Sequence, residues 1–231
     1  MEKKDIISLL DLTLLEDGAT NQAIQPLAHK ANEHQVAAIC VLPQHIPFIP
    51  ADINILRATV INFPSGDEPK KEVLQQIKYA LHEDKVDEID YVFPYKAYLN
   101  GETTTALSHY EQCFLICQDH NVTFKVILET GAFPSLQEIY KASMAILKIG
   151  CDFLKTSTGK ISQGASIPAA VALLSAIKDS ASACGIKLSG GVRTAEQARV
   201  YIEIAELMLH KKVDKSWFRL GASSLLDDLL M

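Results

Sequence analysis

The chain has 231 residues, of which 48% are hydrophobic, and it carries a formal net charge of −6 at pH 7. This length fits two small domains or one α/β barrel of the usual size. The acidic balance argues against non-specific nucleic-acid binding, because no surplus of cations is available to neutralise phosphates. No apolar run is long enough to span a bilayer, and the first residues lack the apolar core of a signal peptide.

Apolar runs that favour β-strands recur along the whole chain and alternate with helical patterns. Several of them, such as residues 36–42, are apolar at nearly every position, which is typical of parallel strands covered on both faces. We predict eight strands, which in chain order occupy residues 9–14, 36–42, 56–63, 88–93, 123–130, 151–157, 186–189 and 218–221.

Helical periodicity between these strands predicts helices at residues 70–82, 136–147, 167–180 and 195–209. Ser135 and Thr194 are expected N-caps, because Glu138 and Gln197 follow them at the spacing of a capping box. The connection at residues 43–52 carries three prolines, and we expect it to hold only a short or broken helix.

Eight strands that are mostly followed by helices predict an α/β fold, a single (β/α)8 TIM barrel over residues 1–231. A doubly wound open sheet is the alternative, but it usually has fewer strands and a glycine-rich turn after its first strand. Residues 16–20 hold no such turn, and no linker, repeat or low-complexity tract indicates a second domain.

The five cysteines are odd in number and scattered, which argues against a disulfide framework and favours a reducing cytoplasm. Cys113 and Cys117 lie four residues apart on an expected helix, a spacing that suits either a metal site or two half-buried thiols. No second pair of ligands follows at a suitable spacing. We therefore interpret both as thiols and predict no metal.

The most informative residue is Lys155, near the end of the expected strand at residues 151–157. Most lysines in strands are solvated charges, but the apolar neighbours Phe153 and Leu154 indicate a strand buried on both faces. Burial lowers the pKa of a lysine, and an uncharged amine is a nucleophile that forms Schiff bases. Lys187 lies in a similar setting, and we expect its charge, more than burial, to lower the pKa of Lys155.

Polar residues gather where the expected strands end, which is where TIM barrels carry their active sites. A lone strand aspartate such as Asp90 more often binds loop amides, but beside two lysines it becomes a candidate proton carrier. We expect the strand interiors to be nearly all apolar elsewhere. The polar strand ends are Asp11, Thr13, Cys40, Asn62, Asp90, Glu129, Thr130, Lys155, Lys187, Gly221, Ser223 and Ser224.

The last two strand ends predict an anion site. Residues 190–194 read Gly-Gly-Val-Arg-Thr and residues 221–225 read Gly-Ala-Ser-Ser-Leu, and each segment leads into an expected helix. Glycines let a ligand approach the backbone, helix N-termini present free N–H groups, and many barrels hold phosphate at these two loops. A phosphate site without a Walker A or Rossmann motif is therefore predicted here.

In order along the chain, segments 11–13, 38–41, 62–66, 88–95, 125–131, 153–160, 187–194 and 219–225 resemble those of the deoxyribose-phosphate aldolase family. The resemblance implies a class I aldolase, free of metal and cofactor, and dimers are common in similar enzymes. It implies cleavage of 2-deoxy-D-ribose 5-phosphate to acetaldehyde and D-glyceraldehyde 3-phosphate. Lys155 would form the Schiff base, and Asp90 and Lys187 would donate and accept protons. The implied substrate and phosphate contacts are Asp11, Thr13, Gly159, Lys160, Gly190, Gly191, Val192, Arg193, Gly221, Ser223 and Ser224.

Two features depart from the family pattern. Leu188 and Ser189 stand where the family often has proline and alanine, which changes the loop without removing the lysine. The chain ends at Met231 without the tyrosine-terminated tail of some members, so we expect the proton-exchange role suggested for that tail to be absent or filled by another group. Cys40, near a strand end, is open to reaction with aldehyde products, but we favour a buried structural thiol.

Two other functions fit parts of this pattern. A transaldolase-like Schiff-base enzyme would accept a ketose phosphate where the aldolase uses acetaldehyde. A phosphosugar sensor without catalytic activity would keep the barrel, but binding alone does not need an amine of low pKa. The joint presence of Lys155, Lys187 and Asp90 therefore favours an enzyme.

Overall fold

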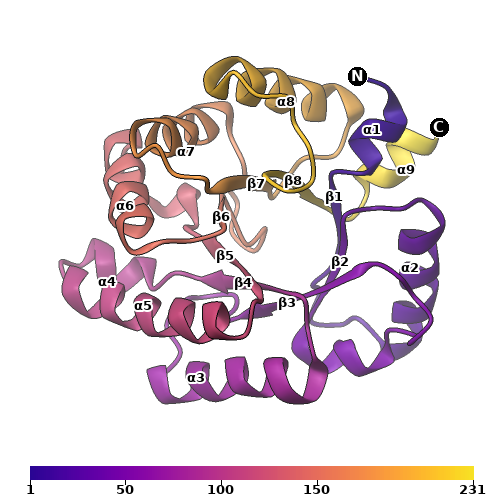
Figure 1. Ribbon diagram of the computed structural model, residues 1–231, viewed down its shortest axis with the longest axis horizontal. Coiled ribbons are helices and arrows are strands. Elements are labelled where there is room, and N and C mark those ends of the chain that lie inside the picture. Colours follow the sequence, from indigo (N-terminus) through magenta and orange to yellow (C-terminus); the bar gives the residue numbers. More distant parts are fainter.

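The computed structural model describes residues 1–231, and its centre is a closed barrel of eight parallel strands (Figure 1). Each strand pairs with the next along the chain, and β8 closes the barrel against β1. The closed order confirms the predicted TIM barrel and rules out the open sheet. The strands are β1 (Leu10–Leu14), β2 (Ala38–Val41), β3 (Leu56–Ile61), β4 (Glu88–Val92), β5 (Thr123–Ile127), β6 (Phe153–Lys155), β7 (Gly185–Ser189) and β8 (Phe218–Ala222).

All eight predicted strands are present, and most are shorter than predicted. The largest difference is at β6, which keeps only Phe153–Lys155 of the expected residues 151–157. Thr156 still donates its backbone N–H to the carbonyl of Lys187, but its hydroxyl turns to the carbonyl of Ser189. The chain thus leaves the regular ladder directly after Lys155, which places this side chain at the mouth of the barrel.

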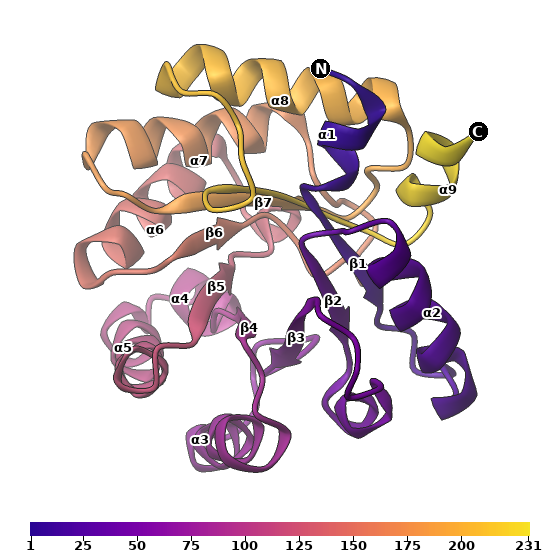
Figure 2. The same ribbon diagram turned by 45° about the vertical axis from the view of Figure 1, so that its right-hand side comes forward.

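A ring of helices surrounds the barrel, and Figure 2 shows α8 and α3 on opposite sides of it. The short terminal helices α1 and α9 lie side by side in both views. The helices are α1 (Lys3–Ile7), α2 (Asn21–Glu33), α3 (Lys70–Tyr79), α4 (Tyr95–Leu99), α5 (Thr103–Asp119), α6 (Leu136–Ile149), α7 (Ile167–Asp179), α8 (Ala195–Leu209) and α9 (Leu225–Leu230). None of them combines the length and the hydropathy that crossing a membrane requires.

The four predicted helices correspond to α3, α6, α7 and α8, and their ends differ by at most three residues. The end of α3 differs because its last turn widens into a π-helical segment, Ala80–Asp84. Thr194 and Gln197 form the predicted capping box, and Ser135 accepts the N–H of Glu138. The proline-rich connection holds only a 3₁₀ helix, Pro43–Phe48, as expected.

The outer face of the sheet packs against these helices through apolar and aromatic side chains. Tyr91 of β4 stacks on Phe124 of β5 with ring centroids 5.3 Å apart, and Tyr110 and Phe114 of α5 lie against them. Cys113 is part of this layer and is fully buried, as is Cys117. The thiol interpretation therefore holds, although these thiols are fully buried and not half-buried.

The inner face of the barrel contradicts the expectation of nearly apolar strand interiors. β2 and β3 do place a small apolar cluster there, with Ala38, Cys40 and Val60 among its members. Strands β4, β5 and β8 instead bury Glu88, Lys125 and Arg219. The difference arises because these charged groups neutralise one another across the barrel, which makes their burial tolerable.

Candidate active site

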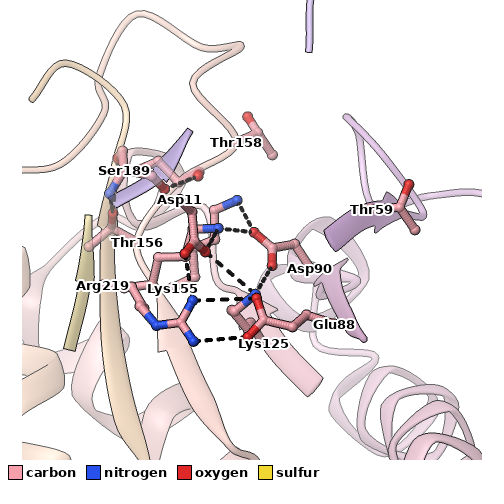
Figure 3. Close-up of polar contacts among 12 residues, drawn as sticks. Asp11, Thr59, Glu88, Asp90, Lys125, Lys155, Thr156, Thr158, Ser189 and Arg219 are labelled. Carbon is pink, nitrogen blue, oxygen red and sulfur yellow. Dashed lines mark hydrogen bonds and ion pairs between the residues drawn. The ribbon is translucent and has the colours of Figure 1, made fainter. Parts of the chain in front are cut away.

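Lys155, Lys187 and Asp90 meet inside the barrel, near its carboxyl-terminal mouth. Figure 3 shows Lys155 and Asp90 within the cluster of buried charged side chains. Strands β6 and β7 are paired so that Lys155 and Lys187 are directly opposite each other. Both ammonium nitrogens lie 2.6 Å from the same oxygen, Oδ2 of Asp90 on β4. Two amines that are 32 positions apart in sequence therefore share one carboxylate oxygen.

Lys155 is the lysine whose pKa lies below its ordinary value. Burial is the largest cause, because an ammonium loses its hydration in the barrel. The carboxylate of Asp90 opposes the shift, and the charge of Lys187 adds to it. The expectation that Lys187 outweighs burial is therefore wrong, since the chain closes around Lys155 so completely that only 1% of this residue is exposed.

Lys187 behaves in the opposite way although it is equally buried. Burial alone would lower its pKa, but the carboxylates of Asp11 and Asp90 outweigh burial and raise it above the ordinary value. The Lys187 nitrogen lies 2.5 Å from Oδ2 of Asp11 and 2.6 Å from Oδ2 of Asp90. The two lysines thus differ in charge preference because Lys187 has two carboxylate partners and Lys155 has one.

Asp11 is fully buried and lies below the mouth of the barrel. Burial would raise its pKa, but Lys187, Lys125 and Arg219 together hold the pKa well below the usual range. The Arg219 guanidinium donates to its Oδ1 over 2.6 Å. This position gives Asp11 ion-pair partners and no contact with the cavity, in contrast to the substrate contact implied by the resemblance.

Sequence reasoning missed three further members of the cluster, which are Glu88, Lys125 and Arg219. Lys125 donates to Glu88 over 2.6 Å and to Asp90 over 2.9 Å. Arg219 donates to the other oxygen of Glu88 over 2.9 Å. The alternation of strand side chains was the available signal, because Glu88 lies two positions before Asp90 and therefore on the same face.

A cavity of about 330 Å³ opens above Lys155 at the carboxyl-terminal ends of β1, β6, β7 and β8. Asp90 and Lys187 lie behind Lys155 and do not line it. Most of the other residues singled out in the sequence do line it, from the ends of β1, β6, β7 and β8. They are Thr13, Gly159, Lys160, Gly190, Gly191, Val192, Arg193, Gly221, Ser223 and Ser224.

The two glycine-containing loops present unpaired backbone donors to this cavity. The N–H groups of Gly190, Gly191 and Val192 donate to no acceptor in the chain, and neither do those of Ser223 and Ser224. Gly190 and Gly191 have φ angles of 87° and 95°, which favour glycine and turn the loop back over the cavity. Such a concave set of N–H groups suits an anion with several oxygens.

Gly221 has a different role, because it leaves room for the side chain of Lys187. A Cβ atom added at this position would lie 3.0 Å from Cε of Lys187 and 3.0 Å from Cβ of Ser189. A larger residue here would therefore require Lys187 or Ser189 to shift by a few tenths of an ångström.

Glu129, one of the predicted polar strand ends, fixes the loop after β6 together with Thr158. The buried carboxylate of Glu129 accepts the backbone N–H and the hydroxyl of Thr158, and the Thr158 hydroxyl accepts the N–H of Lys160. Burial raises the pKa of Glu129, while these hydrogen bonds act against that shift. Glu129 also has a φ of 58°, in the left-handed region, for which the sequence carried no signal.

Cys40 lies on the inner face of β2 and is fully buried. Burial and the charge of Asp90 raise the pKa of its thiol to about 11, which disfavours the reactive thiolate. Cys40 does not line the cavity above Lys155. These facts agree with the preferred interpretation of a buried thiol.

Comparison with known proteins places this geometry in a family. Residues 6–229 match the model of the DeoC/LacD family aldolases. A deoxyribose-phosphate aldolase from Agrobacterium fabrum is 39% identical over 231 residues, which cover 97% of this chain and 88% of that protein.

Solved structures of related proteins show the same fold. A structure from Coccidioides immitis, described provisionally as a deoxyribose-phosphate aldolase, superposes with a TM-score of 0.85 at 26% identity, covering 100% of this chain and 88% of that one. A tetrameric deoxyribose phosphate aldolase from Aeropyrum pernix has the same fold, with a TM-score of 0.84 at 22% identity over 99% of this chain and 91% of that one. The chain belongs to the DeoC/LacD family of aldolases.

Proposed function

We propose that this protein is a class I deoxyribose-phosphate aldolase, which interconverts 2-deoxy-D-ribose 5-phosphate with acetaldehyde and D-glyceraldehyde 3-phosphate. The observation that carries the proposal is the position of Lys155. Its amine, with a lowered pKa, lies at the floor of a cavity and within 2.6 Å of the carboxylate of Asp90. The 39% identical relative from Agrobacterium fabrum carries this enzyme name.

The first half of the reaction uses the amine of Lys155. In its neutral form, this amine adds to the C1 aldehyde of the open-chain sugar, and loss of water gives an iminium ion. The iminium withdraws electrons from the adjacent C2–C3 bond. Burial favours this step because it keeps the free amine uncharged and therefore nucleophilic.

Asp90 and Lys187 then move protons. A base formed by Asp90, acting through Lys187 or a water molecule, removes the proton of the C3 hydroxyl. The C2–C3 bond breaks, its electron pair neutralises the iminium to an enamine, and glyceraldehyde 3-phosphate leaves. Protonation of the enamine at C2 and hydrolysis of the new iminium release acetaldehyde and restore Lys155.

The rim of the cavity supports binding of the substrate phosphate. Five backbone N–H groups without acceptors in the chain belong to residues of the cavity lining, 190–192 and 223–224. Arg193 and Lys160 add positive charge, and Lys160 also lies 3.5 Å from Asp17. A phosphate held there would place the other end of a five-carbon sugar over Lys155.

Borohydride trapping with acetaldehyde tests the proposal. We expect a stable ethyl adduct on the peptide that contains Lys155, located by mass mapping. The absence of that adduct would refute the Schiff-base role. If a ketose phosphate were trapped and acetaldehyde were not, the transaldolase-like function would replace the aldolase.

The compartment and the assembly belong to the same proposal. Five free thiols suit a reducing compartment such as the cytoplasm. We propose a homodimer, and light scattering coupled to size-exclusion chromatography measures its mass directly. A tetramer, the state described for the relative from Aeropyrum pernix, would overturn the dimer.

A further inference from the structure

We propose that Lys125, Glu88 and Arg219 act as positioning residues that balance the buried charge, so that Lys155 is the one amine of the cluster without a proton. The inference rests on the proposed Schiff-base function of Lys155. It assigns a role in catalysis to three residues that do not line the cavity above the lysine.

The cluster contains one more cation than it contains anions. Its potential cations are Lys125, Lys155, Lys187 and Arg219, and its carboxylates are Asp11, Glu88 and Asp90. All seven residues are at most 4% exposed, so water screens none of them well. An uncompensated charge at such a site is costly. Loss of one proton from one of the lysines makes the whole cluster neutral.

The contacts decide which lysine loses the proton. Lys125 lies near Glu88 and Asp90, at 2.6 and 2.9 Å, and Lys187 lies near Asp11 and Asp90. Arg219 is held by two carboxylates, and a guanidinium does not deprotonate in proteins.

Lys155 has only Asp90, and it shares that oxygen with Lys187. It is also the only one of the four cations that reaches the cavity. Lys155 is therefore the residue whose protonated form is least stabilised by carboxylates.

One further carboxylate, Asp152 directly before β6, interacts with Lys125 and Glu88, but it is only half-buried and accepts the backbone N–H of Phe124, so it stands outside the fully buried cluster. Cys40, from β2, is a neutral thiol, and the inner face of β3 contributes Ala58 and Val60. Glu129, after β5, directs its carboxylate to Thr158. Lys160, after β6, is exposed and lies near Asp17. The charge balance of the buried cluster thus depends on its four potential cations and three carboxylates.

Lys125→Met removes a cation and leaves three carboxylates facing Lys187 and Arg219. A protonated Lys155 then makes the cluster neutral. The acid-side midpoint of the plot of Lys155 trapping against pH should therefore move upward by about 1–3 pH units. Activity at pH 7 should fall by about tenfold for each unit and recover at higher pH. The control is Lys125→Arg, which keeps the charge and should keep the midpoint near that of the wild type.

Glu88→Gln removes an anion, and it should move the acid limb downward. The double variant Lys125→Met/Glu88→Gln contains two fixed cations and two carboxylates, so its midpoint should return toward that of the wild type. A purely structural role predicts the contrary, because two disrupted contacts would then harm activity more than one.

The experiment measures borohydride trapping of acetaldehyde on Lys155 from pH 5 to 10 in the wild type and the four variants. Opposite shifts in the two single variants and a restored midpoint in the double variant support the proposal. Unshifted midpoints, or a double variant that resembles Lys125→Met, would overturn it. Should Lys125→Met fail to fold, the downward shift of Glu88→Gln decides alone. A wild type that traps nothing at any pH refutes the proposed function itself, which is a separate result.

Discussion

The two faces of the same barrel strands bury very different side chains. Towards the helices, β4 and β5 carry Tyr91 and Phe124, whose rings stack on each other. Towards the axis, the same two strands carry Asp90 and Lys125, which form an ion pair. The outer layer therefore stabilises the fold by burying apolar surface. In the inner layer, ion pairing offsets the free-energy cost of desolvating the charges.

The difference teaches that stability and reactivity are located on opposite faces of one sheet. Replacement of an outer residue should change unfolding and leave the chemistry intact. Replacement of an inner residue should change rates and pH dependence, and it should also lower the free energy of unfolding wherever it leaves a buried charge without a partner. The following predictions test this division, beginning with the largest expected effect.

Lys155→Met should reduce turnover by a factor on the order of 10⁴ or more, because no other buried amine reaches the cavity. Its thermal midpoint should not fall, since the substitution removes a buried amine that has only one carboxylate partner and that the charge balance leaves without a proton. Steady-state kinetics and thermal unfolding monitored by circular dichroism measure the two effects. Retained turnover would contradict the nucleophilic role.

Phe114→Ala, in the outer layer on α5, should lower the free energy of unfolding by about 3–5 kcal/mol. The ring packs on Tyr110 and Phe124 and leaves a cavity when it is removed. Activity per folded molecule should stay within about twofold of the wild type, because the site lies on the other face. Urea unfolding and active-site titration provide the comparison, and a large loss of specific activity would break the division between the faces.

Lys187→Met should move the acid limb of the pH–rate profile upward by about 1–3 units. The charge of Lys187 lowers the pKa of Lys155, so without it Lys155 keeps its proton to a higher pH and becomes active only there. The kcat/KM profile from pH 5 to 10 measures the shift. A uniform loss at every pH, with the midpoint unchanged, would show that Lys187 contributes proton transfer alone.

Ser224→Asp should weaken the binding of phosphorylated substrates by about tenfold, because it places a carboxylate beside the unpaired N–H groups of the cavity rim. Ser224→Asn is the matched neutral control. In the aspartate variant, the KM for deoxyribose 5-phosphate should rise, whereas the KM for free deoxyribose should stay at the wild-type value. An equal effect on both sugars would contradict the phosphate site.

Much of the fold was predictable because local patterns agree with it. The run of apolar residues at 36–42 indicated a strand covered on both faces, and β2 lies within it. The capping box at Thr194 marked the first turn of α8 correctly. Strand ends also indicated that Lys155 and Lys187 meet, because neighbouring parallel strands end at the same mouth.

The charged interior was not predictable in the same way. Alternation places Glu88 on the inner face, but its partner Arg219 is 131 positions away and meets it only across the closed barrel. The extent of burial around Lys155 depends likewise on side chains from several strands, so the cause of its low pKa was misjudged. Glu129 has a left-handed conformation and accepts two hydrogen bonds from Thr158, and its residue type does not predict that conformation.

The hydrogen bond between Asp11 and Arg219 joins positions separated by 208 residues, from the first strand to the last. Such a contact forms late, because the entropy of closing so long a loop must be overcome before the contact contributes any stability. The network of ion pairs is therefore incomplete until β8 has been synthesised and has paired with β1. The environment that lowers the pKa of Lys155 exists only in the closed barrel.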